Sequence, residues 1–445
     1  MKGSSLALIC SRESASPNNE EGWRSDALER DDTVRSEADC VIVGGGIGGA
    51  VLALTLGQRG HRVIVLEREL QPPGMGRPEV LARSTMEVFQ RLGAGTRMMQ
   101  EAALPLCGLE LWQSGGTRLF SLSRGDFLRA GAQPYSTDPA RTRRILLEQA
   151  EATASVEIQR GVEVRELIRD GSRGIGVRAV QGQTPLSVKA HLVVGDDGGH
   201  SRIRESLHIP LTTQAFPLDF VTAAGPALPS QPEALGQAWV NPCAIRTGIF
   251  GGIFMPLPNS RVAMVFLMRP GVYERFRQGD PRIFYDAAAH LSPLCTDLAR
   301  TYKFPDGFTH LQRPFGHAPR YVADGAALMG DAAHPVSPAG GQGANMSVAD
   351  AVILAEVAHD ALVRGDCSAA RLQLYERNRR PANTRSLQLS VRTTAVLRLL
   401  RTLPWLAPIL PRLLAWAERG SETKDRLIRT VSQSFTSPML SNWNS

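Results

Sequence analysis

The architecture of this chain can be inferred from one segment, Cys40-Val41-Ile42-Val43-Gly44-Gly45-Gly46-Ile47-Gly48-Gly49-Ala50-Val51-Leu52-Ala53-Leu54. An apolar run leads into a glycine cluster, and apolar residues at helical spacing follow it. A second apolar run, Arg62-Val63-Ile64-Val65-Leu66, comes next and ends before Glu67. The pattern predicts a strand, a turn, a helix and a second strand.

The glycine cluster matches G-x-G-x-x-G, and the spacing has a mechanism. Gly44 permits a tight turn, Gly46 lets a pyrophosphate approach the backbone, and Gly49 allows close packing of the helix. The N-terminus of that helix offers free N–H groups and positive potential. Glu67, at the end of the second strand, can accept hydrogen bonds from both ribose hydroxyls. We therefore predict dinucleotide binding, because a turn without a ligand does not explain this acid.

Two later segments repeat the layout of an apolar strand, Gly-Asp at its carboxyl end, and a turn. They are Val193-Val194-Gly195-Asp196-Asp197-Gly198-Gly199-His200-Ser201-Arg202-Ile203-Arg204 and Ala327-Leu328-Met329-Gly330-Asp331-Ala332-Ala333-His334-Pro335-Val336-Ser337-Pro338-Ala339-Gly340-Gly341-Gln342-Gly343-Ala344-Asn345. In an α/β sheet such positions converge at the ligand crevice. We expect all of these turns to close around one ligand.

In this order the motifs resemble those of the class A flavoprotein monooxygenases, which have the para-hydroxybenzoate hydroxylase fold. Within that family the chain is similar to ubiquinone-pathway hydroxylases and squalene epoxidases, over about residues 38–355. The resemblance implies an α/β fold, with an FAD-binding Rossmann-like domain interleaved with an antiparallel β-sheet substrate domain, plus C-terminal helices. Asp196 stands where the family usually has Ala, and we expect this extra carboxylate to point away from the pyrophosphate.

The resemblance also implies which residues bind FAD. Gly44, Gly46, Gly49 and Glu67 would hold the ADP half. Arg77 would lie near the ribose and diphosphate, unless it is only a solvated loop charge. The remaining expected cofactor-binding residues are Asp197, which would also contact NADPH or NADH, Asp331, which would hydrogen-bond the ribityl chain, and Ala344 and Asn345 at the start of the next helix.

The stretch from Pro338 to Asn345 is expected to carry the chemistry. By resemblance, Pro338, Gly340, Gly341 and Gly343 form the catalytic loop and leave room for the isoalloxazine ring. A helix N-terminus at this point would stabilise the negative charge of the reduced flavin by about 0.3 to 2 kcal/mol. His334 belongs to the cofactor-binding motif, so we do not expect it to act as a general base.

The family resemblance implies a reaction. NADPH or NADH reduces FAD, O2 adds to form a flavin C4a-hydroperoxide, and its distal oxygen is transferred to an electron-rich carbon. We predict an FAD-dependent monooxygenase acting on a hydrophobic, aromatic or quinone-like small molecule. An epoxidase or another polyketide or terpenoid tailoring oxygenase stays open, as does a catalytically silent flavin-binding protein with a basic interaction surface.

The middle of the chain predicts antiparallel strands around 248–254 and 261–267, separated by the turn-forming stretch 256–260. These strands would form the sheet of the substrate domain. Its substrate-facing side is expected to use some of the following large residues, unless they are ordinary core: Trp239, Phe250, Phe254, Met264 and Phe266.

Composition excludes several classes of protein. The 445 residues are 43% apolar and 21% charged, which is typical of a globular chain with two or three lobes. No apolar run reaches the roughly 18 residues of a membrane span. The six cysteines are dispersed, which argues against a metal centre or disulfide framework and favours a cytoplasmic location. The apolar patch within Met1 to Cys10 is too short to be the hydrophobic region of an export signal.

We expect four regions along the chain: a disordered acidic tail at 1–37, an FAD-binding domain at 38–110, 138–212 and 313–372, a substrate domain at 111–137 and 213–312, and a C-terminal helical region at 373–445. Residues 377–430 carry twelve basic and three acidic side chains. Nucleic acid is not an expected partner, because no nucleic-acid-binding motif accompanies this charge. Arg, Trp and Leu at 395–418 indicate either peripheral membrane contact or a helical pair packed on the FAD-binding domain.

Overall fold

The computed structural model describes residues 34–71, 78–229, 234–241, 247–312, 314–337, 341–402 and 420–432. The predicted strand–turn–helix–strand unit is confirmed as β1 (Val34–Val43), α1 (Ile47–Gln58) and β2 (Val63–Glu67). The first four residues of β1, 34–37, lie within the predicted acidic tail, and residues 34–38 pair with β11. This part of the expected boundary is wrong, and residues 1–33 lie outside the described residues.

The first sheet has eight strands, and its central path runs β19-β20-β11-β1-β2-β8. β20, β11, β1, β2 and β8 are mutually parallel. Val43 of β1 pairs with Gly195 of β11, which pairs with Leu328 of β20. The carboxyl ends of these neighbouring strands are therefore level, which is how a parallel sheet forms a ligand crevice. The other strands of this sheet are β8 (Val156–Arg160), β9 (Val162–Asp170), β10 (Arg173–Gln181), β11 (Thr184–Gly195), β19 (Val322–Ala323) and β20 (Ala326–Leu328).

The second sheet has seven strands in the order β17-β13-β16-β15-β14-β5-β6. The predicted antiparallel pair is confirmed as β15 (Ile249–Leu257) and β16 (Arg261–Met268). One face of this sheet packs on α8 (Val272–Gln278), α9 (Pro281–Ala289) and α10 (Pro293–Thr301). The other strands are β5 (Gly108–Gln113), β6 (Thr117–Ser123), β13 (Asp219–Pro226), β14 (Leu235–Val240) and β17 (Thr309–Leu311).

Two small sheets lie between these layers, β3-β7-β4 and β12-β18. Their strands are β3 (Glu79–Leu81), β4 (Ala103–Pro105), β7 (Tyr135–Thr137), β12 (Thr212–Gln214) and β18 (Phe315–His317). The other helices that precede α11 in the chain are α2 (Arg83–Arg91), α3 (Gly95–Arg97), η2 (Met98–Ala102), α4 (Arg124–Arg129), α5 (Pro139–Glu151), α6 (Arg202–Ser206) and η3 (Gly330–Ala332).

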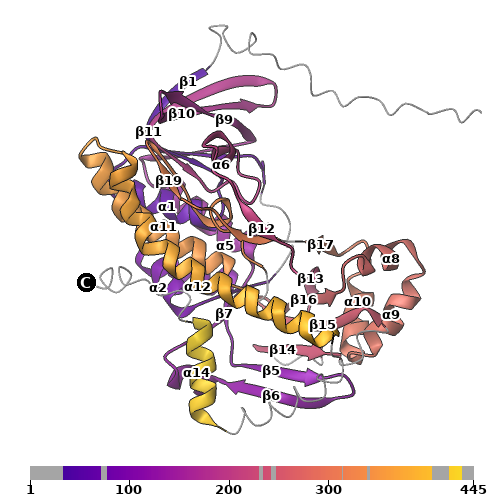
Figure 1. Ribbon diagram of the computed structural model, residues 1–445. Helices are drawn as coiled ribbons and strands as arrows, with labels where there is room; N and C mark the ends of the chain where they lie inside the picture. Colours follow the sequence, from indigo (N-terminus) through magenta and orange to yellow (C-terminus); the bar gives the residue numbers. More distant parts are fainter. Residues whose placement is uncertain are drawn as a thin grey trace, which may run out of the picture.

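Long helices complete the fold. α11 (Gly343–Val363) contacts α1 and α12 (Ala369–Thr402), and Figure 1 shows α11 and α12 lying along the first sheet. α14 (Ser421–Ser432) contacts α4 at the opposite end of the molecule, near β5 and β6 (Figure 1). Within the described residues, none of the helices combines the length and apolar character needed to cross a bilayer.

Candidate active site

The glycine-rich turns that follow β1, β11 and β20 meet at one cavity of about 220 Å³. The sequence predicted this convergence, and the level carboxyl ends of the strands explain it. The residues that line the cavity come from each turn and from the start of α11: Gly46, Ile47, Pro78, Glu79, Asp196, Gly198, Asp331, Val336, Ser337, Gly341, Gln342, Gly343, Ala344 and Ser347.

The first turn is shaped by positions that tolerate only glycine. Gly44 has φ +103°, and a Cβ there would lie 2.3 Å from the carbonyl oxygen of Asp196. A Cβ on Gly49 would lie 2.2 Å from the carbonyl oxygen of Gly44. Gly46 lines the cavity with its backbone exposed to a ligand. The turn is therefore a cradle of backbone groups at the start of α1, suited to a pyrophosphate.

Glu67 lies directly behind this turn. Its Oε2 accepts a hydrogen bond from Gly45 N at 2.8 Å and pairs with Arg143 Nη2 at 2.6 Å. Its Oε1 accepts from Glu69 N at 2.8 Å. Ionised carboxylates offer about four acceptor positions, so room remains for a ribose hydroxyl. The predicted ribose contact stays a prediction: Glu67 is 7% exposed and is not among the residues that line the cavity.

Arg143 is a residue of this site that the sequence did not indicate. It lies on α5, and besides pairing with Glu67 it donates from Nε to the carbonyl oxygen of Gly45 at 2.6 Å. One partner belongs to the dinucleotide turn and the other to the end of β2 behind it, so α5 holds the turn and the strand end together. Arg143 stands next to Arg144 in a charged stretch of sequence, and nothing nearby indicates this role. Its partner Glu67 lies 76 residues earlier in the chain.

The second turn presents Asp196 to the cavity, which corrects an expectation. The carboxylate does not point away: its Oδ2 accepts from Gly49 N at 2.7 Å, and Asp196 lines the cofactor cavity. Burial raises its pKa well above the ordinary value, and the carboxylates of Asp331, Asp197 and Asp350 raise it further. Asp196 therefore acts as an acceptor for the start of α1, contributed from another strand.

Asp197, the predicted cofactor contact, turns toward α6. Its Oδ2 accepts from Arg202 N at 2.7 Å and from Ile203 N at 3.2 Å, and burial raises its pKa. Arg204, from the same motif, is buried and donates to the carbonyl oxygens of Ala332 at 3.0 Å and Gly199 at 2.8 Å. Arg204 thus ties the second turn to the third. A cofactor contact by Asp197 stays a prediction.

The third turn delivers Asp331 and the start of α11 to the cavity. Gly341 has φ +65°, and Gly341, Gly343 and Ala344 all line the cavity. Gln342, the N-cap residue, provides no side-chain cap for α11, and the first turn of the helix carries no acid. The N–H groups and positive end of this helix therefore face the cavity, as predicted for the reduced flavin.

Asn345 is fully engaged with the protein. Its Oδ1 accepts from Ala82 N at 2.8 Å and Thr85 Oγ1 at 2.7 Å, and its Nδ2 donates to the carbonyl oxygens of Val80 at 2.8 Å and Gly341 at 3.3 Å. The side chain fixes the start of α11 against β3 and α2. Its predicted role in cofactor binding therefore depends on its backbone rather than on its amide group.

A buried ionic network supports the third turn from below. Asp350 on α11 pairs with His334, and its Oδ1 accepts from Arg379 Nε at 2.7 Å and from Asn383 Nδ2 at 3.1 Å. Burial alone would raise the pKa of Asp350, but His334 and Arg379 hold it below its ordinary value. His334 is 1% exposed, so a structural role fits it better than general-base chemistry, as expected.

Several predicted residues cannot be placed. Arg77, Pro338 and Gly340 lie outside the described residues, as does most of 395–418. Of the predicted catalytic loop, Gly341 and Gly343 are described, and both lie at the cofactor cavity.

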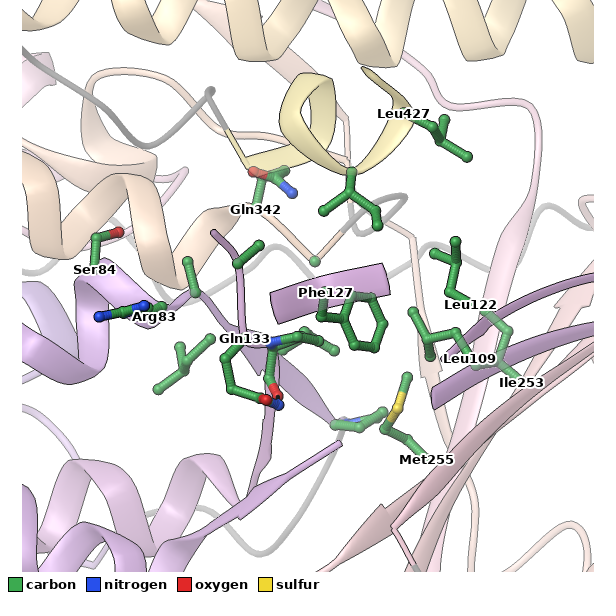
Figure 2. A pocket seen from close by; sticks show the side chains of 18 of the residues that line it. Arg83, Ser84, Leu109, Leu122, Phe127, Gln133, Ile253, Met255, Gln342 and Leu427 are labelled. Carbon is green, nitrogen blue, oxygen red and sulfur yellow. Dashed lines mark hydrogen bonds between the residues drawn. The ribbon is translucent and has the colours of Figure 1, made fainter. Parts of the chain in front are cut away.

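A second, larger cavity of about 710 Å³ adjoins the first. The two share Pro78, Gly341 and Gln342 in their walls. The lining of the larger cavity is mostly apolar and comes from the second sheet, α2, α4 and α14, as Figure 2 shows for Leu109, Leu122, Phe127, Ile253, Met255 and Leu427. A hydrophobic molecule in the larger cavity would therefore meet a cofactor in the smaller one.

Four of the five large residues that were expected either to face the substrate or to be ordinary core are core residues. Trp239, Phe254, Met264 and Phe266 pack in the cluster formed with α8, α9 and α10. Their neighbours Ile253, Met255 and Val265 line the cavity instead. Successive residues of a strand face opposite sides, so an error of one position reverses the assignment. Phe250 packs in a separate cluster with Phe220 and Val265.

Gln133 is a buried amide side chain at the apolar cavity, and the sequence did not indicate this position either. Its Nε2 donates to the carbonyl oxygens of Leu106 at 2.9 Å and Pro134 at 3.0 Å. Both N–H bonds are thus committed, which fixes the amide orientation and leaves Oε1 as an acceptor. Arg83 and Glu87, which also line the cavity, are about half exposed and pair with each other at 2.8 Å. Gln133 stands between Ala132 and Pro134, and nothing in this local sequence indicates that its side chain is buried at a cavity.

Comparison with known proteins gives this site a family. The sequence profile described as "FAD binding domain" matches residues 37–390. The chain belongs to this family. As a flavoprotein monooxygenase it is similar to the ubiquinone hydroxylase UbiL of Rhodospirillum rubrum, with 30% identity over 380 residues and 81% of each chain covered. It is also similar to 6-methylpretetramide 4-monooxygenase of Streptomyces rimosus, with 28% identity covering 80% of this chain and 83% of that one.

A solved structure supports the fold. The P. aeruginosa PqsL complex with 2-aminobenzoylacetate has a TM-score of 0.71 at 23% identity, covering 81% of this chain and 96% of that one. The predicted fold class, the class A monooxygenase family and FAD as cofactor are thereby confirmed. A reduced nicotinamide nucleotide is the co-substrate typical of the family. When bound, FAD supplies the redox chemistry and the activation of O2, while the flavoprotein monooxygenase positions and shields it.

Proposed function

We propose that this flavoprotein monooxygenase uses NADPH or NADH and O2 to insert one oxygen atom into a hydrophobic, aromatic or quinone-like small molecule. The observation that carries the proposal is the apolar cavity of about 710 Å³ that shares Pro78, Gly341 and Gln342 with the cofactor cavity. A largely apolar pocket with a few placed polar groups is typical of a small-molecule site.

The residues of the chain divide the work. The cradle at Gly44, Gly46 and Gly49 would hold the pyrophosphate, with Glu67 behind it and Asp331 at the ribityl position. The start of α11 would place N–H groups beside the ring edge where negative charge develops on reduction. Gln133 Oε1 would accept a hydrogen bond from a donor on the substrate, and the apolar walls would exclude water from the reacting centre.

The relatives support a hydrophobic substrate without naming it. One is named a ubiquinone hydroxylase and another a 6-methylpretetramide 4-monooxygenase. An epoxidase or another polyketide or terpenoid tailoring oxygenase is the alternative, because the apolar walls suit an alkene as well as a ring. The acceptor at Gln133 favours hydroxylation of a phenol-like molecule, since an isolated alkene would leave it without a partner.

A substrate screen tests the proposal. NADPH and NADH oxidation is measured with phenols, quinones, polyketides and isoprenoid alkenes, in parallel with mass spectrometry of products formed under ¹⁸O2. We expect a phenol or hydroquinone to accelerate NAD(P)H oxidation and to gain a single ¹⁸O atom. Epoxidation of an alkene with no reaction of phenols would favour the alternative, and the absence of labelled product from all classes would refute oxygenation.

We also propose a cytoplasmic location with peripheral membrane contact through 395–418, and no nucleic-acid partner. The support is the Arg, Trp and Leu content of that segment and the dispersed spacing of the cysteines along the sequence. Flotation with anionic liposomes tests the contact. Protein that stays at the bottom of the gradient with and without lipid would refute it.

A further inference from the structure

The C-terminal helix α14 forms part of the wall of the larger cavity. Leu427 and Ile428 both line it, and Ile428 is 5% exposed. Ile428 packs in a cluster with Phe120, Leu122 and Phe127 of β6 and α4. The FAD-binding family profile ends at residue 390, so this wall comes from a part of the chain beyond the matched domain.

Reciprocal ion pairs hold α14 on α4. Lys424 Nζ lies 3.6 Å from Asp126 Oδ2, and Arg129 Nε lies 3.1 Å from Asp425 Oδ1. The Lys424 ammonium also lies 5.9 Å from the centre of the Phe120 ring. Each helix thus contributes an acid and a base, and the arrangement opposes both sliding and rotation of α14.

The anchor determines which side chains face the cavity. Residues three and four positions apart share one side of a helix. Leu427 and Ile428 follow Lys424 at these spacings, so anchoring Lys424 turns both apolar side chains inward. Asp126 stays ionised at neutral pH: burial would raise its pKa, but hydrogen bonds from Ser123 N–H and Arg129 lower it to about 2.

We propose that α14 is a specificity-determining wall, in which Leu427 and Ile428 set the size limit of the molecule that the cavity accepts. The inference rests on the proposed function in assigning this cavity to the substrate. Residues of α14 do not contribute to the described lining of the cofactor cavity, so a change in the wall alters substrate choice while FAD content stays the same.

Binding of a neutral probe tests the wall independently of turnover. N-phenyl-1-naphthylamine is titrated by fluorescence into the FAD-loaded full chain, and 4-methylphenol and 4-heptylphenol are then used as competitors. The variants are Ile428→Trp, Leu427→Trp and Ile428→Ala. Leu374→Trp is the matched control: Leu374 lies on α12, away from the cavity lining, and its exposed fraction of 50% is close to the 44% of Leu427.

We expect Ile428→Trp to weaken probe binding by about tenfold or more, since one methylene group in a hydrophobic pocket already changes affinity by about 10- to 200-fold and the larger Trp side chain would occupy more of the cavity than one methylene group. Leu427→Trp should act in the same direction. Ile428→Ala should raise the ratio of the 4-heptylphenol to the 4-methylphenol affinity by at least about threefold. The control should match the wild type within a factor of about two. FAD content and the unfolding temperature check that each variant is folded.

Equal dissociation constants in all four variants and the wild type would overturn the inference, as would wild-type protein that does not bind the probe. The proposed function fails separately: the α14 variants can change binding as expected while no phenol is oxygenated, which would leave the wall in place and remove the reaction. If phenols are oxygenated but the α14 variants select substrates as the wild type does, the proposed function would stand and the proposed wall would be refuted.

Discussion

Replacing Asp196 by Asn should remove a pH dependence from FAD binding. The carboxyl lies, partly buried, between the first and third turns, with its Oδ2 2.7 Å from Gly49 N. Burial and neighbouring carboxylates raise its pKa, so the protonated form is favoured in the folded chain. A bound pyrophosphate is negative and would favour the protonated form further. FAD should therefore bind more weakly as pH rises and Asp196 ionises.

The size of the effect follows from the position of the carboxyl beside the start of α1. Two unit charges separated by one helical turn, about 5.4 Å, repel by about 3 kcal/mol at an effective dielectric constant of about 20. This energy corresponds to roughly two pKa units, or about a hundredfold in the dissociation constant. A single titrating proton limits the slope to about one decade per pH unit.

The assay is titration of apoprotein with FAD, followed by flavin fluorescence from about pH 5 to pH 10. Asp196→Asn keeps an acceptor for Gly49 N–H but cannot ionise, so its dissociation constant should stay flat where the wild-type value rises. Asp197→Asn is the matched control: its Oδ2 accepts from the backbone N–H groups of Arg202 and Ile203 in α6. The rise should persist but begin at a lower pH, because the Asp197 carboxylate no longer raises the pKa of Asp196. A rise of equal slope in Asp196→Asn would refute the reasoning.

The same carboxyl should affect stability in the apoprotein. A group whose folded-state pKa is raised holds its proton longer in the folded than in the unfolded chain. The free energy of unfolding should therefore fall as pH rises from the unfolded pKa toward the folded one. Asp196→Asn should unfold at a higher denaturant concentration than the wild type on the alkaline side, and the two should converge in acid.

Three further outcomes are expected. Gln133→Leu should lower kcat/KM for a phenol by about tenfold, the worth of one hydrogen bond, and leave its methyl ether unaffected; equal losses for both would exclude the contact. Arg379→Met should destabilise the chain by about 3 kcal/mol in urea unfolding, because Asp350 keeps its buried charge, whereas the exposed Arg377→Met should not; equal midpoints would contradict this. Asp331→Ala should yield mainly apoprotein, and a normal flavin-to-protein absorbance ratio would refute the ribityl assignment.

Motif spacing predicted the parts of the fold that depend on local backbone geometry. The turn at Gly44 needs a positive φ and space that only glycine provides, so it is visible in the sequence. The side of a strand that meets the ligand is not visible in the sequence in this way. An apolar strand that is covered on both sides has no alternation of apolar and polar residues to reveal it. Phe254 and Met255 are both buried, and only the packing of α9 and α10 decides that Met255 lines the cavity.

Long-range partners account for the rest of what the sequence did not show. Arg143 reaches the first turn from a helix in another part of the chain, and Ile428 reaches the cavity from beyond the domain that the family profile matches. The sequence did not indicate the ion pairs between α14 and α4, since the partners Arg129 and Asp425 are separated by 296 residues. Such contacts are set by how the layers pack, which a single sequence does not encode locally.

The motif residues in this protein serve the protein as much as the ligand. Asn345 makes side-chain hydrogen bonds to β3, to the start of α2 and to Gly341 of its own turn, Arg204 joins the second turn to the third, and His334 is buried against Asp350. Their shared effect is to hold separate turns at fixed distances before any cofactor arrives. A site preorganised in this way does not have to be assembled by the ligand, so binding energy is not consumed in ordering loops. It follows that changes at Asn345 or Arg204 should weaken FAD and destabilise the apoprotein together, whereas a residue that only contacts FAD should leave apoprotein stability unchanged.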